Sequence, residues 1–241
     1  IPYFVIFISF ILSIIISVYT LNKHDKNIYS QDIIYHKMIK ADAYRYLSHG
    51  AEIKKEIEDG NNFFLAGREN YTKYLPPRLA AAYYYFFDKE LFNNFEDKII
   101  NTGIHLEYLI IQCLIYFFSV FILYLVIKEK FEERVINIII IFLCFEPTLF
   151  QYHVSFWSES IFFSLQILVL SLLLIENKKF LGFIFLGFFV GVLSLQKQMA
   201  IFYIIPLMLY VFIFSKNKKT ISLFILFFGY LMIQIFLGYN N

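Results

Sequence analysis

Residues 1–20, "IPYFVIFISFILSIIISVYT", decide the fold class, because a run this long without a charged side chain is apolar enough to sit in lipid. The rest of the chain is similar: 59% of its 241 residues are hydrophobic, including 31 Phe and 19 Tyr. A mean hydropathy of +0.63 is too apolar for one soluble domain. The two cysteines, Cys113 and Cys144, fall inside apolar runs without metal-ligand spacing, so we expect them to be packing residues.

The apolar runs predict an all-α integral membrane protein, with residues 1–241 forming one polytopic domain. A cleaved signal peptide is the alternative for the first run, but no small-residue cleavage site follows it, so we favour a retained helix. Since the chain begins at Ile1 without a Met, we expect it to be a piece of a longer protein. The seven predicted spans are residues 2–21, 106–127, 135–152, 157–175, 180–196, 199–215 and 220–238.

A long polar segment, residues 22–105, separates the first two predicted spans. It contains twelve Lys or Arg and twelve Asp or Glu, together with apolar residues at helical spacing. This balance predicts amphipathic helices that lie on the membrane lipids, with a solvated spacer as the alternative. The net charge of the chain is only +2, which gives no sign of a nucleic-acid partner.

Cations in the short loops predict the orientation in the membrane. The loops "KEKFEER" (128–134), "NKK" (177–179) and "KNKK" (216–219) all fall on one face if seven spans are present. Because Lys and Arg favour the cytoplasmic side, that face is predicted to be cytoplasmic. Segment 22–105 is then extracytoplasmic, and we expect a multi-pass protein of a bacterial inner membrane.

Four charged residues are predicted at the ends of spans rather than in loops. They are Glu107, Glu146, Glu159 and Lys197, and all four lie at the span ends that face segment 22–105. Charges at membrane depth cost a few kcal/mol each on insertion scales, so they usually face a polar cavity and carry function. The pattern predicts a polar chamber at the extracytoplasmic surface.

Each of these charges also has a simpler explanation. Glu107 can be an interfacial helix N-terminus, where the dipole favours a negative charge. Glu146 precedes Pro147 and can end a helix, and Lys197 can extend to the headgroups. Glu159 is the hardest to explain in this way, because it begins a long apolar helix.

The stretch "IKADAYRYLSHGAEI" (39–53) concentrates polar side chains just beyond the first span. In a helix over residues 31–58, Asp42, Tyr46 and His49 share one face, and Arg45 neighbours them. A carboxylate there can accept a proton or bind a metal ion, while Arg and Tyr can hold phosphate or sugar groups. Many surface helices also carry an acid and a base on one face.

Four stretches in order carry a resemblance to a known family: "DAYRYLSHGAEI" (42–53), "YLPPRLAAAYYYFF" (74–87), "EPTLFQYHVSFWSESIFFSLQILVLSLLL" (146–174) and "GFFVGVLSLQKQMAIFYIIPLMLYVF" (187–212). The chain resembles the GT-C superfamily of membrane glycosyltransferases, closest to the protein O-mannosyltransferase and aminoarabinose-transferase branch. It departs from that pattern in having Ala41 and Ala43 around Asp42, where the family has Asp-Glu or an Arg-containing variant. It also has Lys197 where Arg is usual, which keeps the charge but loses the bidentate fork.

The resemblance implies an inverting transfer of a sugar from a polyprenyl-phosphate-linked donor to a lipid, glycan or protein acceptor. Asp42 would be the catalytic base or the ligand of a divalent metal ion. Arg78 and Lys197 would hold the carrier phosphate, and Glu159 would orient the acceptor, the sugar or a neighbouring cation. A polyprenyl carrier needs no Gly-rich nucleotide loop, and the sequence contains none. The further substrate-binding candidates are Arg45, Tyr46, His49, Glu146 and His153.

Two other classes of protein remain as alternatives. A transporter or flippase for a lipid-linked or anionic substrate would also place charges in the membrane, but near the midplane and at broken helices. An assembly subunit would use these charges only to pair with one another, since a fold alone does not fix function. Crowding of the charges on one face, beneath a long amphipathic loop, favours the enzyme.

Overall fold

The computed structural model describes residues 1–25, 43–62, 66, 75–87, 106–154, 158–175, 180–214 and 219–235. Over these residues the protein is helical and contains no strand, which confirms the predicted all-α class for the described part of the chain. The elements are α1 (Pro2–Asp25), α3 (Ala43–Glu58), α4 (Leu75–Phe86), α5 (Leu106–Ile127), α6 (Glu133–Phe145), α7 (Pro147–Val154), α8 (Ser158–Leu174), α9 (Phe180–Gln196), the 3-10 helix η1 (Gln198–Tyr203), α10 (Ile204–Phe214) and α11 (Lys219–Ile233).

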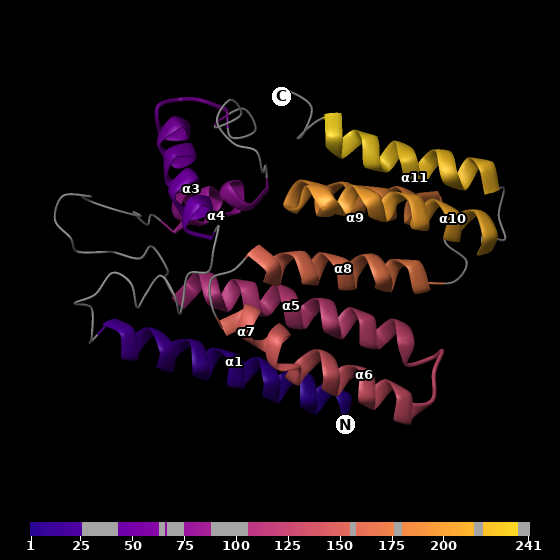
Figure 1. The fold of residues 1–241 in the computed structure, drawn as a ribbon, viewed down its shortest axis with the longest axis horizontal. Helices are drawn as coiled ribbons and strands as arrows, with labels where there is room; N and C mark the ends of the chain where they lie inside the picture. The colour runs from indigo at the N-terminus through magenta and orange to yellow at the C-terminus, as the bar shows by residue number, and fades with distance from the viewer. Residues whose placement is uncertain are drawn as a thin grey trace.

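The long apolar helices lie side by side, and α3 and α4 form a separate pair at one end of them (Figure 1). Two helical segments, Pro2–Tyr19 and Leu106–Ile127, are long and apolar enough to cross a membrane. The other apolar helices, such as α8 and α9 with 17 residues each, are shorter than the roughly 20 residues that a bilayer core requires. The seven predicted spans therefore stay a prediction.

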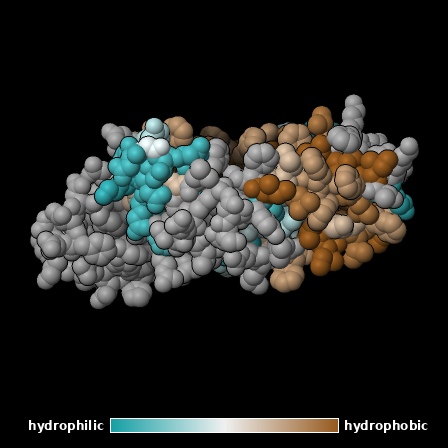
Figure 2. All heavy atoms as spheres, turned by 90° about the horizontal axis from the view of Figure 1, so that it is seen from above, coloured by the Kyte–Doolittle hydropathy of each residue, from teal (hydrophilic) through white to brown (hydrophobic). Residues whose placement is uncertain are grey.

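Large apolar side chains are exposed along these helices. Phe224 of α11 is 71% exposed, and Phe212 and Ile213 of α10 are more than half exposed. Figure 2 shows an apolar surface over this part of the molecule and hydrophilic residues over the region of α3. Such a continuous apolar surface is unfavourable in water and favourable in lipid, which is the environment expected of a membrane protein.

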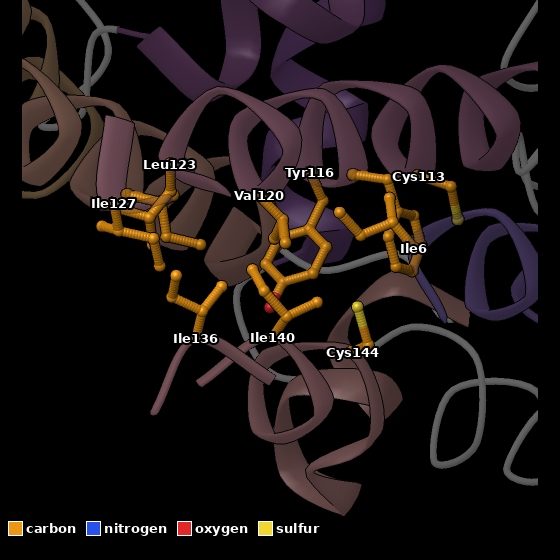
Figure 3. Packing of buried hydrophobic residues seen from close by; sticks show 11 residues of the cluster. Ile6, Cys113, Tyr116, Val120, Leu123, Ile127, Ile136, Ile140 and Cys144 are labelled. Atoms are coloured by element: carbon orange, nitrogen blue, oxygen red, sulfur yellow. The ribbon is translucent and has the colours of Figure 1, made fainter. Parts of the chain in front are cut away.

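The first apolar core joins α1, α5 and α6. Ile6 of α1, Val120 of α5 and Ile140 of α6 are buried in it. Figure 3 shows the ring of Tyr116 within this cluster, directed from α5 toward Ile140. Cys113 and Cys144 are buried thiols in the same cluster, as expected of packing residues.

A second core joins α9 and α11 at very close range. A Cβ added to Gly187 would lie 2.0 Å from the carbonyl oxygen of Leu226, and one added to Gly229 would lie 2.4 Å from that of Ile184. Small residues let the two backbones approach, as in other membrane helix pairs.

The predicted span 135–152 is divided into α6 and α7, and this corrects the single helix expected there. Pro147 has no N–H for the carbonyl of Leu143, and it disfavours a helical backbone at the preceding residue. Glu146 accordingly has an extended conformation, with φ −61° and ψ 124°. The predicted span 199–215 likewise begins with the 3-10 turn η1 before α10.

The pair α3 and α4 covers one end of the bundle. Gly50 of α3 lets the helices cross closely, since a Cβ there would lie 2.6 Å from the Cβ of Ala80. On its other side, α4 packs Leu75 and Leu79 against Ile161 and Leu193, near the ends of α8 and α9. Helix α3 supplies the C-terminal part of the helix predicted over 31–58, whereas residues 31–42 lie outside the described residues.

Candidate functional site

The four charges predicted at span ends all lie at helix ends, and three of them lie on the side of α4. Glu107 and Glu159 are in the first turns of α5 and α8. Glu146 follows α6, and Lys197 follows α9. In Figure 1 the starts of α5 and α8 and the end of α9 lie toward α3 and α4, and we refer to these three helix ends as the polar end of the bundle. The end of α6 lies farther along α5, because Leu143 is bonded by Tyr116 in the middle of that helix, so Glu146 is not part of the polar end and its predicted place at the outer end of a span is corrected.

Glu159 and Lys197 form the central ion pair of the polar end. The Nζ of Lys197 donates to Oε1 of Glu159, although the two residues are 38 positions apart in the sequence. The side chain of Lys197 is 29% exposed and that of Glu159 is 18% exposed, so both are largely withdrawn from solvent. The ammonium also lies 5.3 Å from the centroid of the Phe162 ring, a cation–π distance. Helix α8 begins where α9 ends, which is why these distant residues meet.

Glu107 contacts α4 through a tyrosine. The hydroxyl of Tyr83 lies 3.5 Å from Oε2 of Glu107, and its ring packs edge-on against Tyr108 at 5.1 Å. Burial raises the pKa of Tyr83 far above its ordinary value, and the negative charge of Glu107 raises it further. The phenol is therefore neutral at physiological pH and serves as a donor, which fixes α4 over the start of α5.

Glu146 caps α7. Its Oε2 accepts the backbone N–H of Leu149 at 2.7 Å, and Pro147 occupies the first position of the helix. This observation agrees with the simpler explanation of Glu146 as a helix-end residue, while a role in substrate binding stays a prediction. His153 lies in α7, but its side chain is outside the described part of the structure.

Arg78 is 3% exposed, and its Nη2 donates to the carbonyl oxygen of Ala66 at 2.5 Å. Arg78 of α4 therefore binds the backbone of the segment that connects α3 with α4. A contact between Arg78 and a carrier phosphate stays a prediction.

The other residues predicted in segment 39–53 belong to α3 or precede it. Tyr46 of α3 is only 6% exposed and is therefore buried, whereas His49 of the same helix is partly exposed. Asp42 and the side chain of Arg45 lie outside the described residues. The structure thus brings Glu159 and Lys197 together, and the convergence of Asp42 with them stays a prediction.

The site residues predicted from the sequence did not include three polar residues that lie in apolar helices. Gln112 donates to the carbonyl of Tyr152 at 2.8 Å, Tyr116 donates to the carbonyl of Leu143 at 2.7 Å, and Gln166 donates to the hydroxyl of Tyr203 at 2.7 Å. Uncharged polar groups in a membrane helix also need partners, so a Gln within an apolar run is the sequence signal for such residues. Among the described residues, no three His, Cys, Asp or Glu side chains could together hold a metal ion.

A known protein family matches residues 98–238, which is more than half of the chain. The matching family is described as dolichyl-phosphate-mannose-protein mannosyltransferase. No curated protein sequence and no solved structure matches the chain. The matched region begins just before α5 and ends just after α11, so it contains the Glu159–Lys197 pair and the apolar helices. The chain belongs to the dolichyl-phosphate-mannose-protein mannosyltransferase family and is a membrane glycosyltransferase of the GT-C type.

Proposed function

We propose that this protein transfers a sugar from a polyprenyl-phosphate-linked donor to a lipid, glycan or protein acceptor at the extracytoplasmic membrane face. The observation that supports the proposal most directly is the Glu159–Lys197 pair, which lies at the polar end within the region matched by the family. A cation at the end of the membrane helices is suited to the phosphate of a lipid carrier, whose tail remains in the bilayer.

The charge change in the reaction explains why Lys197 would be catalytic. The donor is a phosphodiester with one negative charge, and the departing polyprenyl phosphate approaches two. A fixed ammonium therefore stabilises the transition state more than the ground state, which is the condition for lowering the barrier. Glu159 holds the ammonium in one direction before the donor binds, so less reorganisation is required during the reaction.

Activation of the acceptor is the second requirement, and we assign it to Asp42. An acceptor hydroxyl would attack the anomeric carbon while the bond between that carbon and the phosphate oxygen breaks. The carboxylate of Asp42 would take the hydroxyl proton, and the electron pair of the broken bond would leave with the phosphate. A divalent metal ion held by Asp42 would instead supply Lewis-acid activation of the same hydroxyl.

The orientation is supported by the charges in the loops. The turn between α5 and α6 contains Lys128 and Lys130 and lies at the opposite end of α5 from Glu107. Basic loops favour the cytoplasmic side, so the polar end would face outward in the plasma membrane of a bacterium. The other two basic loops, residues 177–179 and 216–219, lie on the same side as this turn only if the chain crosses the membrane seven times.

The test uses the full-length protein in proteoliposomes, with dolichyl-phosphate mannose labelled in the sugar as the probe and added envelope extract as acceptor. We expect label to move from the lipid donor into acceptor material and the Lys197→Ala protein to lose at least about a hundredfold in rate, the loss typical of a missing transition-state contact. The exposed Lys55→Ala protein is the control and should keep its rate. If dolichyl- and undecaprenyl-phosphate donors carrying mannose, glucose or aminoarabinose all fail to react, the proposal is wrong.

A further inference from the structure

The break between α6 and α7 removes the helical donor of one backbone carbonyl, and the end of α7 removes that of a second. Leu143 would bond to the N–H of residue 147, which is a proline. Tyr152 lies in the last turn of α7, where carbonyls have no partner within the helix. Inside a membrane, such groups are tolerated only when another part of the protein satisfies them.

One helix supplies donors to both carbonyls. The hydroxyl of Tyr116 donates to Leu143 at 2.7 Å, and Nε2 of Gln112 donates to Tyr152 at 2.8 Å. Gln112 and Tyr116 are four residues apart on α5, so they lie on one face. The two residues are 1% and 0% exposed, so bulk solvent has little access to these hydrogen bonds.

Helix α7 also connects these donors to the ion pair. The ring of Tyr152 stacks on Phe163 at a centroid distance of 5.4 Å and an interplanar angle of 23°. Phe163 is four residues after Glu159 and therefore lies on the same side of α8. A shift of α7 against α5 would thus reach the first turn of α8, where Glu159 holds Lys197.

We propose that Gln112 and Tyr116 are positioning residues for the transfer reaction: they hold the broken α6–α7 segment against α5 and so orient Glu159. This inference rests on the proposed function for its catalytic part only, because the holding of α6 and α7 can be measured separately. Neither residue needs to touch substrate. Their effect on the reaction would come through α7, Phe163 and Glu159.

Two buried native thiols provide the direct test. Cys144 is 2% exposed and follows Leu143, whereas Cys113 is fully buried beside Gln112 on α5. The full-length protein in membranes is treated with N-ethylmaleimide, and the alkylation of each thiol is followed by peptide mass spectrometry. Tyr116→Phe keeps the ring and removes the donor, and Gln112→Met keeps the length of the side chain. Ser119→Ala is the matched control, because that hydroxyl donates only within α5, to the carbonyl of Ile115 at 2.7 Å.

We expect Cys144 to react about tenfold faster in Tyr116→Phe and faster again in the double variant, as an unsatisfied buried carbonyl favours local opening. Cys113 should be unchanged in Tyr116→Phe, and Ser119→Ala should resemble the parent. In the mannose-transfer assay we expect kcat to fall about tenfold with the KM for the donor nearly unchanged, because Lys197 itself keeps its place directly after α9.

Unchanged reactivity of Cys144, or equal increases at Cys144 and Cys113, would overturn the inference. Faster alkylation of Cys144 with an unchanged kcat would limit the two residues to a structural role and would also overturn it. If the parent protein transfers no sugar, the proposed function fails, while the alkylation rates still decide whether α5 holds α7.

Discussion

At the scale of single residues, the ion pair between Glu159 and Lys197 has the clearest energetic consequence. Each side chain is mostly withdrawn from water, so removing one partner leaves the other charge poorly solvated. The pair therefore contributes both to stability and to the position of the cation. These two contributions respond differently when the charges are exchanged.

Exchange of the charges should restore folding without restoring activity. Lys197→Glu alone places two carboxylates together and should lower the midpoint of thermal unfolding in detergent. The double variant Glu159→Lys/Lys197→Glu re-forms a pair and should recover most of that stability, but it moves the cation to α8 and should stay at least about a hundredfold slower in sugar transfer. Lys197→Arg keeps the charge in place and serves as the control that retains activity. Recovery of activity in the exchanged double variant would show that Lys197 has no specific role.

Asp42 is the second residue whose role can be separated from folding. Asp42→Asn keeps the size and removes the base, so turnover should fall by roughly two to four orders of magnitude if Asp42 accepts the proton. Glu52→Gln is the control, because Glu52 is an exposed carboxylate on the neighbouring α3 and should be nearly silent. Equal losses in both variants would remove Asp42 from the mechanism. A loss that added Mg²⁺ or Mn²⁺ does not reverse would favour the base over the metal ligand.

At the scale of helices, the closeness of α9 and α11 matters because Lys197 directly follows α9. Gly187, Gly191 and Gly229 provide the contact surface, and a Cβ added at Gly187 or Gly229 would meet the backbone of the facing helix, whereas one at Gly191 would first meet the side chain of Ile233. Backbone atoms cannot rotate away as side chains do, so the helices must separate.

Gly187→Ala should destabilise the protein by about 1–3 kcal/mol, because its Cβ would lie 2.0 Å from the Leu226 carbonyl oxygen. The fraction of protein that stays monodisperse after heating in detergent measures this change. Phe185→Ala on the same helix removes a side chain that is 53% exposed and should have a much smaller effect. A Gly187→Ala protein as stable as the parent would mean that α9 and α11 are not in contact in the membrane.

At the scale of the whole molecule, charge separates the two ends of the helices. The polar end contains charges that meet one another across helices, whereas the turn from Lys128 to Lys130 at the other end of α5 is exposed or half-buried and carries basic residues. This asymmetry underlies the proposed orientation, because the retention of basic loops inside the cell depends on their charge.

The orientation predicts opposite labelling of two single cysteines. Lys55→Cys on α3 should react with a membrane-impermeant maleimide in intact cells, and Glu129→Cys in the α5–α6 turn should react only after permeabilisation. Both positions are exposed, and the native Cys113 and Cys144 are buried and should give a low background. Labelling of Glu129→Cys in intact cells would reverse the orientation and place the proposed site inside the cell.

Much of the helical pattern was predictable from the sequence, because a helix in lipid depends mainly on a local run of apolar residues. The predicted runs 106–127 and 180–196 have the same bounds as α5 and α9, and the charges at helix ends were found by the cost of placing them in lipid. Pro147 in the sequence indicated a helix end at Glu146, although a single span over residues 135–152 was predicted.

Only the tertiary structure decided which polar groups meet. The pairing of Glu159 with Lys197, the contact of Arg78 with Ala66 and the donors from α5 to the α6–α7 break each join residues that are 12 to 40 positions apart. Such pairs depend on which helix faces pack together and at what height along their axes. A local sequence determines that a buried polar group needs a partner, but the packing of distant helices determines which partner it finds.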